Sequence, residues 1–233
     1  MNDLLLTLPE LILSIGAIVL MLVAAWRGDN ATPAISVASV ALLFVAASAV
    51  IANPYGIGFD GLYSGDAFAA FAKILIYAAT AVSIIIAPRF FATGDRLRAE
   101  YPILILFATA GAGIMVSATD LITLYIGLEL QSLASYVLAS FMRRDTRSAE
   151  AGLKYFVLGA LASGILLYGM SMVYGFTGTT AYDGIARAFE AGLTTGQLFG
   201  LVVYSRNIWF IWNTPREGDR APKVRPEKAG NDR

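Results

Sequence analysis

Three ionisable side chains lie inside long apolar stretches of this 233-residue sequence: Lys73, Glu129 and Lys154. A charge exposed to lipid costs several kcal/mol, so such residues usually face protein or water and often mark ion pathways. Burial disfavours the charged form of both a carboxyl group and an amine, whereas attraction between them favours it. A buried carboxylate near a buried ammonium can therefore exchange a proton when its surroundings change. The three residues predict proton handling inside a membrane.

Glu129 is the strongest of these candidates because of its depth. It lies eight residues after Leu121 and fourteen before Arg143, which is about 12 Å and about 21 Å along a helix. Polar residues at helical spacing share its face: Tyr125, Glu129, Ser132 and Tyr136. The alternative is that this polar stripe only joins neighbouring helices through hydrogen bonds. A carboxylate near mid-membrane favours ion handling over that alternative.

The two lysines have competing structural interpretations. Lys154 lies seven residues after Arg147, so it can extend back to the membrane surface or pair with Glu150 at i−4. Lys73 lies seven residues after Asp66, on the same helical face, and a structural function is as well supported as a chemical one. We therefore expect Glu129 and Lys154 to form the proton relay, with Lys73 as a weaker candidate.

Composition restricts the class of protein. Apolar residues make up 57% of the chain and charged residues 15%, against about 25% charged in a typical soluble domain. This indicates a membrane protein and excludes collagen, a disordered chain and a secreted disulfide scaffold. Cysteine and histidine are both absent, which excludes thiolate and imidazole metal ligands and nucleophiles in this chain. The net charge of +0 gives no indication of a nucleic-acid partner.

Six stretches are long and continuously apolar, as a transmembrane helix requires. They are Leu4–Trp26, Ala34–Ala52, Ala67–Ala87, Tyr101–Ala118, Leu121–Met142 and Ala151–Phe176. Leu193–Trp212 is a weaker seventh candidate, because it contains Arg206 and Asn207. The first stretch has acidic rather than basic residues at its start and is followed by a poor cleavage site, which favours an uncleaved span over a signal peptide.

The charges between the spans alternate from loop to loop. One set of loops carries seven basic residues: Arg27, Arg89, Arg96, Arg98, Arg143, Arg144 and Arg147. The opposite set carries one, Arg187, with several acidic residues. Positively charged loops usually stay in the cytoplasm. We therefore expect Arg96 and Arg144 in the cytoplasm, and the N-terminus, Asp60 and Gly178 in the periplasm. A short amphipathic helix is expected at Tyr182–Ala191.

Two long motifs resemble a known family. The run Leu121–Leu138, with Glu-Leu-Gln-Ser-Leu-Ala-Ser-Tyr at 129–136, resembles the fifth helix of subunit N of proton-translocating NADH–quinone oxidoreductase, respiratory complex I. Further matching segments are Ser148–Ala160, Ser163–Gly169, Leu8–Leu11 and Asp66–Lys73. The resemblance covers about residues 1–200. Subunits of cation/proton antiporters share the general plan, but the sequence of the fifth helix favours subunit N.

The resemblance implies an all-α, polytopic transmembrane helix bundle of the antiporter-like kind, here the first inverted repeat only, with six to seven helices. It implies that Glu129 is the family's fifth-helix glutamate and Lys154 the lysine that begins the sixth. The implied assembly, in the bacterial inner membrane, oxidises NADH, reduces a quinone such as ubiquinone and pumps protons. NADH, FMN, iron–sulfur clusters and quinone would be bound by other subunits, and this chain's partners would be other membrane subunits and the lipid bilayer.

The C-terminal part departs from the family pattern. Family chains continue through further lysine-bearing helices, whereas Thr214 onward is charged and contains proline, with ten of the chain's 34 charged residues. We expect a six-helix region at 1–178, an amphipathic segment and weak span at 179–212, and a disordered tail at 213–233. A truncated or frame-shifted reading after about residue 203 is expected, with a natural short paralogue as the alternative, and the DNA after the codon for Arg206, read in all frames, distinguishes the two. For function, the further alternatives are a non-transporting scaffold and a fragment that is not stably made.

Overall fold

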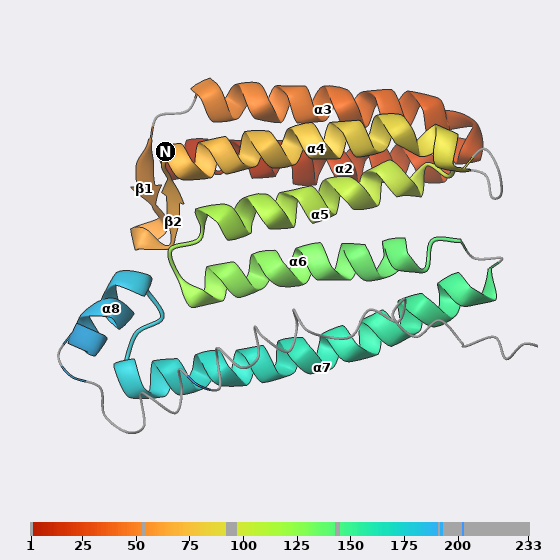
Figure 1. The fold of residues 1–233 in the computed structure, drawn as a ribbon. Helices are drawn as coiled ribbons and strands as arrows, with labels where there is room; N and C mark the ends of the chain where they lie inside the picture. The colour runs from red at the N-terminus through yellow and green to blue at the C-terminus, as the bar shows by residue number, and fades with distance from the viewer. Residues whose placement is uncertain are drawn as a thin grey trace, which may run out of the picture.

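A computed structural model describes residues 2–52, 55–91, 97–142 and 145–190, together with Gly192 and Val202. Within these residues the fold is a bundle of long helices that run in alternating directions (Figure 1). The predicted seventh span at 193–212, apart from Val202, and the tail at 213–233 lie outside the described residues.

Six helices in the described part of the chain are long and apolar enough to cross a membrane. They are α2 (Leu8–Arg27), α3 (Thr32–Ala52), α4 (Ala67–Phe91), α5 (Glu100–Ser117), α6 (Leu121–Ala139) and α7 (Thr146–Thr177). A short α1 (Asn2–Leu6) precedes them, and 3-10 turns occupy Gly28–Ala31 and Phe59–Gly61. The structure confirms all six predicted spans, with small shifts at their ends.

Two prolines affect the ends of the helices. The first span begins at Leu8 rather than Leu4, and Pro9 lies in its first turn, where a helix does not need the missing N–H. The span predicted to end at Ala87 continues past Pro88 to Phe91 as α4. The missing N–H of Pro88 costs one hydrogen bond, in the last turn of the helix.

The two ends of the bundle differ in secondary structure and charge. One end carries a small antiparallel hairpin, β1 (Gly56–Gly58) and β2 (Tyr63–Gly65), and the predicted amphipathic helix, found as α8 (Tyr182–Glu190). We call this the hairpin end (Figure 1). The sequence analysis did not predict the hairpin; its strands are only three residues long. The opposite end, the arginine end, holds Arg27, Arg89, Arg98 and Arg147. The other basic residues predicted at this end, Arg96, Arg143 and Arg144, lie outside the described residues.

Most of the buried core lies among the first four spans. Its members come from α2 to α5 and include Leu13, Ala17, Ile35, Leu43, Tyr77, Ile84, Ile103 and Leu106. A smaller cluster joins α6 to α7 through Leu121, Leu166, Met170 and Val173. Since α6 lies between α5 and α7 (Figure 1), it connects the two cores.

Glycines allow α5 and α6 to pack backbone against backbone. A Cβ atom at Gly111 would lie 2.6 Å from the backbone nitrogen of Gln131, and one at Gly127 would lie 2.8 Å from the carbonyl oxygen of Gly111. Such distances are too short for any larger side chain. Close approach of this kind is how membrane helices pack without a hydrophobic driving force.

Candidate functional site

The helix that carries Glu129 is fixed at its first turn by Asp120. The Asp120 carboxylate accepts hydrogen bonds from the backbone N–H of Ile122 at 2.7 Å and of Thr123 at 3.2 Å, which is the arrangement of an N-cap. Asp120 is only 1% exposed. Its strand-like pairing with Ala181 ties this turn to the start of α8. The start of α6 is therefore held at a defined position at the hairpin end.

Glu129 lies about 12 Å from that first turn and is partly buried. Its Oε1 atom is fully buried and has no hydrogen-bond partner among the described residues. The hydroxyl group of Tyr125, one turn earlier, is close enough to interact with both Glu129 and Ser163 of α7. The polar stripe predicted from the sequence therefore faces α7, with its carboxylate retaining an unused acceptor.

Aromatic contacts align α7 with the far end of this stripe. The ring of Tyr136 packs edge-on against Tyr155 at 4.9 Å and Phe156 at 5.9 Å between centroids. The Tyr136 hydroxyl lies over Gly159, where a Cβ atom would collide with it. Gly164, on the same helix, faces open space.

Lys154 lies against Glu150 rather than against Glu129. Its Nζ atom is 2.7 Å from Glu150 Oε1, and the side chains are 49% and 60% exposed. This confirms the i−4 pairing that the sequence allowed. Because Tyr136 contacts Tyr155, Lys154 is level with Tyr136, about 10 Å along the bundle from Glu129. The two residues proposed as a relay are thus not in direct contact, and their function in proton transfer stays a prediction.

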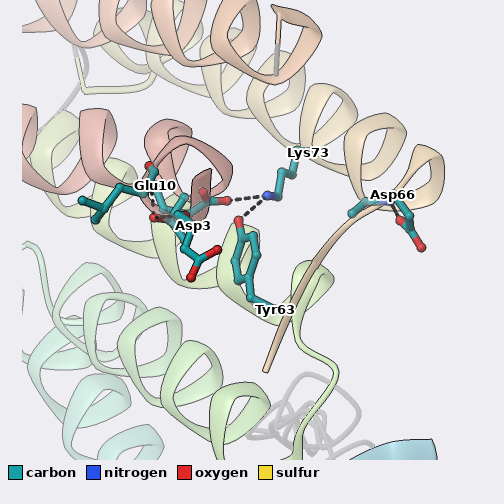
Figure 2. A network of polar contacts seen from close by, with 8 residues as sticks. Asp3, Glu10, Tyr63, Asp66 and Lys73 are labelled. Atoms are coloured by element: carbon teal, nitrogen blue, oxygen red, sulfur yellow. Dashed lines mark hydrogen bonds and ion pairs between the residues drawn. The ribbon is translucent and has the colours of Figure 1, made fainter. Parts of the chain in front are cut away.

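Lys73 is the most deeply buried of the three candidates, at 4% exposure. Its Nζ atom lies 2.7 Å from Oε1 of Glu10 on α2 and donates a hydrogen bond of 2.7 Å to the Tyr63 hydroxyl on β2 (Figure 2). Glu10 is also 4% exposed. Asp66, the partner suggested by sequence spacing, instead accepts a hydrogen bond from the backbone N–H of Ala69 at the start of α4.

The surroundings of this ion pair hold it in place. Burial, and then the nearby charge of Glu10, raise the pKa of Tyr63, so its hydroxyl keeps its proton. The Lys73 ammonium also lies 4.9 Å from the centre of the Tyr63 ring, within the range of a cation–π contact. Gly113 on α5 leaves room for the carboxylate, since a Cβ atom there would lie 3.0 Å from Glu10 Oε1.

The burial of Glu10 was not predicted from the sequence. The acidic residue lies only two positions after the start of α2, which suggests a solvated helix end. One signal pointed the other way: Lys73 lies within an apolar helix and needs a partner of opposite charge.

Comparison with known proteins identifies the family. Residues 118–205 match the family model described as NADH:quinone oxidoreductase/Mrp antiporter, TM. The NADH-quinone oxidoreductase subunit N of Rhizorhabdus wittichii is 65% identical over 201 residues, 84% of this chain. The chain belongs to the subunit N family. The subunit N protein of Erythrobacter litoralis is 55% identical over 204 residues, also 84% of this chain.

Two solved structures share the fold of this chain. Respiratory complex I from Thermus thermophilus contains a chain with a TM-score of 0.68 at 24% identity, covering 87% of this chain and 43% of that one. The archaeal membrane-bound sulfane sulfur reductase gives 0.72 at 22% identity, with 89% and 44% coverage. The chain covers 42% of each of the two subunit N relatives. Family membership and six candidate spans together make it a multi-pass membrane protein.

Proposed function

We propose that this chain is part of a membrane subunit of NADH–quinone oxidoreductase, in which electron transfer from NADH to quinone elsewhere in the complex drives proton translocation. The observation that carries this proposal is the 65% identity to a protein named NADH-quinone oxidoreductase subunit N. NADH, FMN, iron–sulfur clusters and quinone are assigned to other subunits. The partners are the complex's other membrane subunits.

Glu129 and Lys154 are the proposed proton-carrying residues on α6 and α7. A partly buried carboxylate with an unused acceptor atom and a neighbouring tyrosine, Tyr125, that also reaches Ser163 is an arrangement that can take up a proton or bind water. Because about 10 Å separates it from the level of Lys154, transfer between them needs bridging water. Tyr136 lies at the level of Lys154, where its ring contacts Tyr155, and is a side chain that such water would contact.

The proposed location is the bacterial inner membrane, with the hairpin end in the periplasm. Four described arginines at the opposite end and the acidic residues Asp60, Asp66 and Asp183 at the hairpin end support this orientation through the positive-inside rule. The N-terminus then lies in the periplasm.

A cation/proton antiporter subunit is the second candidate, because the matching family model includes Mrp antiporters. Purification from bacterial membranes through an affinity tag on this chain separates the two. Complex I membership predicts co-purification of flavin and iron–sulfur absorbance, and NADH-driven acidification of vesicles. Purification without redox centres, together with Na⁺-dependent proton exchange in proteoliposomes, would contradict complex I and support the antiporter.

A further inference from the structure

The ion pair between Glu10 and Lys73 is surrounded by buried polar atoms that the described residues leave without hydrogen bonds. These atoms are Glu10 Oε2, the Tyr77 hydroxyl and Ser117 Oγ. Tyr77 follows Lys73 by one turn of α4, and Ser117 is close enough to interact with Tyr63. Buried polar groups almost always have a partner in the protein or in ordered water. This group of atoms therefore predicts bound water beside the ion pair.

A cavity leads from the hairpin end to Lys73 of this ion pair. Its volume is about 30 Å³, and its lining runs from Asp66 and Tyr55 to Lys73, past Gly65 and Ala70. Tyr55 and Asp66 are exposed, whereas Lys73 is buried. A polar cavity holds a water molecule once it offers roughly 10–15 Å³. The volume is enough for water to reach the ammonium group from the hairpin end.

We propose that Glu10, Lys73 and Tyr63 form a hydrated proton-exchange site that opens at the hairpin end of the bundle, separate from the polar stripe of Glu129. The Lys73 ammonium gives a proton to the Glu10 carboxylate, and the resulting amine takes a proton from hydronium in the cavity, which leaves a water molecule. Release of the Glu10 proton to water then restores the ion pair. Tyr63 keeps its proton and orients the lysine by accepting its hydrogen bond. The site's ligand is water, and its use in transport rests on the proposed function.

The competing interpretation is a static ion pair that joins α2 to α4. Two features favour exchange over that interpretation. A static pair has no use for a cavity that leads solvent to its cation. Glu10 Oε2 and the Tyr77 hydroxyl have no partner among the described residues, and water that binds them can also carry a proton.

Removing both charges together distinguishes the two interpretations. In membrane vesicles that contain the assembled complex, NADH-driven acidification is compared for wild type, Glu10→Gln, Lys73→Met and the double variant. A static pair predicts that the double variant, which leaves no unpaired charge, recovers both assembly and pumping. Exchange predicts an assembled double variant that loses most of its acidification while NADH oxidation continues. Normal pumping by an assembled double variant overturns the proposal. Absence of pumping in wild type contradicts the proposed function instead.

Cysteine labelling tests the water path without removing any charge, because the chain contains no native cysteine. Ala70→Cys lines the cavity. Phe71→Cys is the matched control, since it lies at almost the same depth, and Phe71 is 68% exposed on the outer face of α4, where we expect lipid. A charged thiosulfonate added from the hairpin side should react with Ala70→Cys much faster than with Phe71→Cys. Equal rates, or no reaction at Ala70→Cys, overturn the hydrated cavity.

Discussion

At the scale of single residues, the two carboxylates within the bundle have different surroundings. Glu10 faces an ammonium at 2.7 Å, whereas Glu129 has a neighbouring tyrosine and an unused oxygen. Removing one partner of a buried ion pair costs about 3–5 kcal/mol, because the other charge is left uncompensated. Glutamine in place of each residue should therefore have different consequences.

Glu129→Gln should leave assembly intact and lower proton pumping. The carboxamide keeps the shape and the hydrogen-bonding capacity of the side chain but does not carry a proton. The measurement is NADH-driven acidification of membrane vesicles, with the amount of assembled complex followed on native gels. Lys154→Met is the companion, since it removes a charge that is half exposed and paired within its own helix. Normal pumping by both variants would show that the polar stripe only joins helices.

Gly127→Ala should destabilise the contact between α5 and α6. The added methyl group would lie 2.8 Å from the carbonyl oxygen of Gly111, so the two backbones must separate. Gly164→Ala is the matched control, because nothing lies within 4 Å of a Cβ atom there. Thermal unfolding in detergent should show a lower midpoint for Gly127→Ala and no loss for Gly164→Ala. Equal midpoints would indicate that α5 and α6 adjust at no cost.

At the scale of helices, apolar run length predicted all six spans, since a membrane helix must be about 20 residues long. Helix partners were less predictable from the sequence. The pairing of Lys154 with Glu150 followed from i−4 spacing within one helix. The partners of Lys73 come from α2 and β2, and spacing within α4 carries no information about other helices. The hairpin was missed because two three-residue strands are too short to show an alternating pattern.

Asp120→Ala should weaken the start of α6 more than Asp145→Ala weakens the start of α7. Asp120 is buried and accepts two backbone hydrogen bonds, whereas Asp145 is exposed and accepts one, from Arg147. Loss of an N-cap costs about 1 kcal/mol, and burial should add to that at Asp120. Hydrogen exchange of the first-turn amides in detergent measures both. A larger effect at Asp145 would contradict the tie between α6 and α8.

At the scale of the whole molecule, basic residues separate to one end of the bundle. This predicts its orientation in the membrane. With Arg98→Cys and Asp60→Cys placed singly in the cysteine-free chain, an impermeant maleimide added to spheroplasts should label only Asp60→Cys. Inverted vesicles should give the opposite pattern, which controls for reactivity of the thiol itself. Labelling of Arg98→Cys in spheroplasts would reverse the orientation and put the hairpin end in the cytoplasm.

The buried ion pair also sets a requirement for how the protein is made. Glu10 and Lys73 are 63 positions apart in the sequence, so at about 5–20 residues per second the lysine is synthesised roughly 3–13 s after the glutamate. During that interval α2 carries a carboxylate with no cation to pair with. A lone apolar helix with such a group enters lipid at a cost of several kcal/mol. We therefore expect α2 to stay at the insertion machinery, or its carboxyl group to stay protonated, until α4 arrives. The first three spans then enter the lipid as one unit.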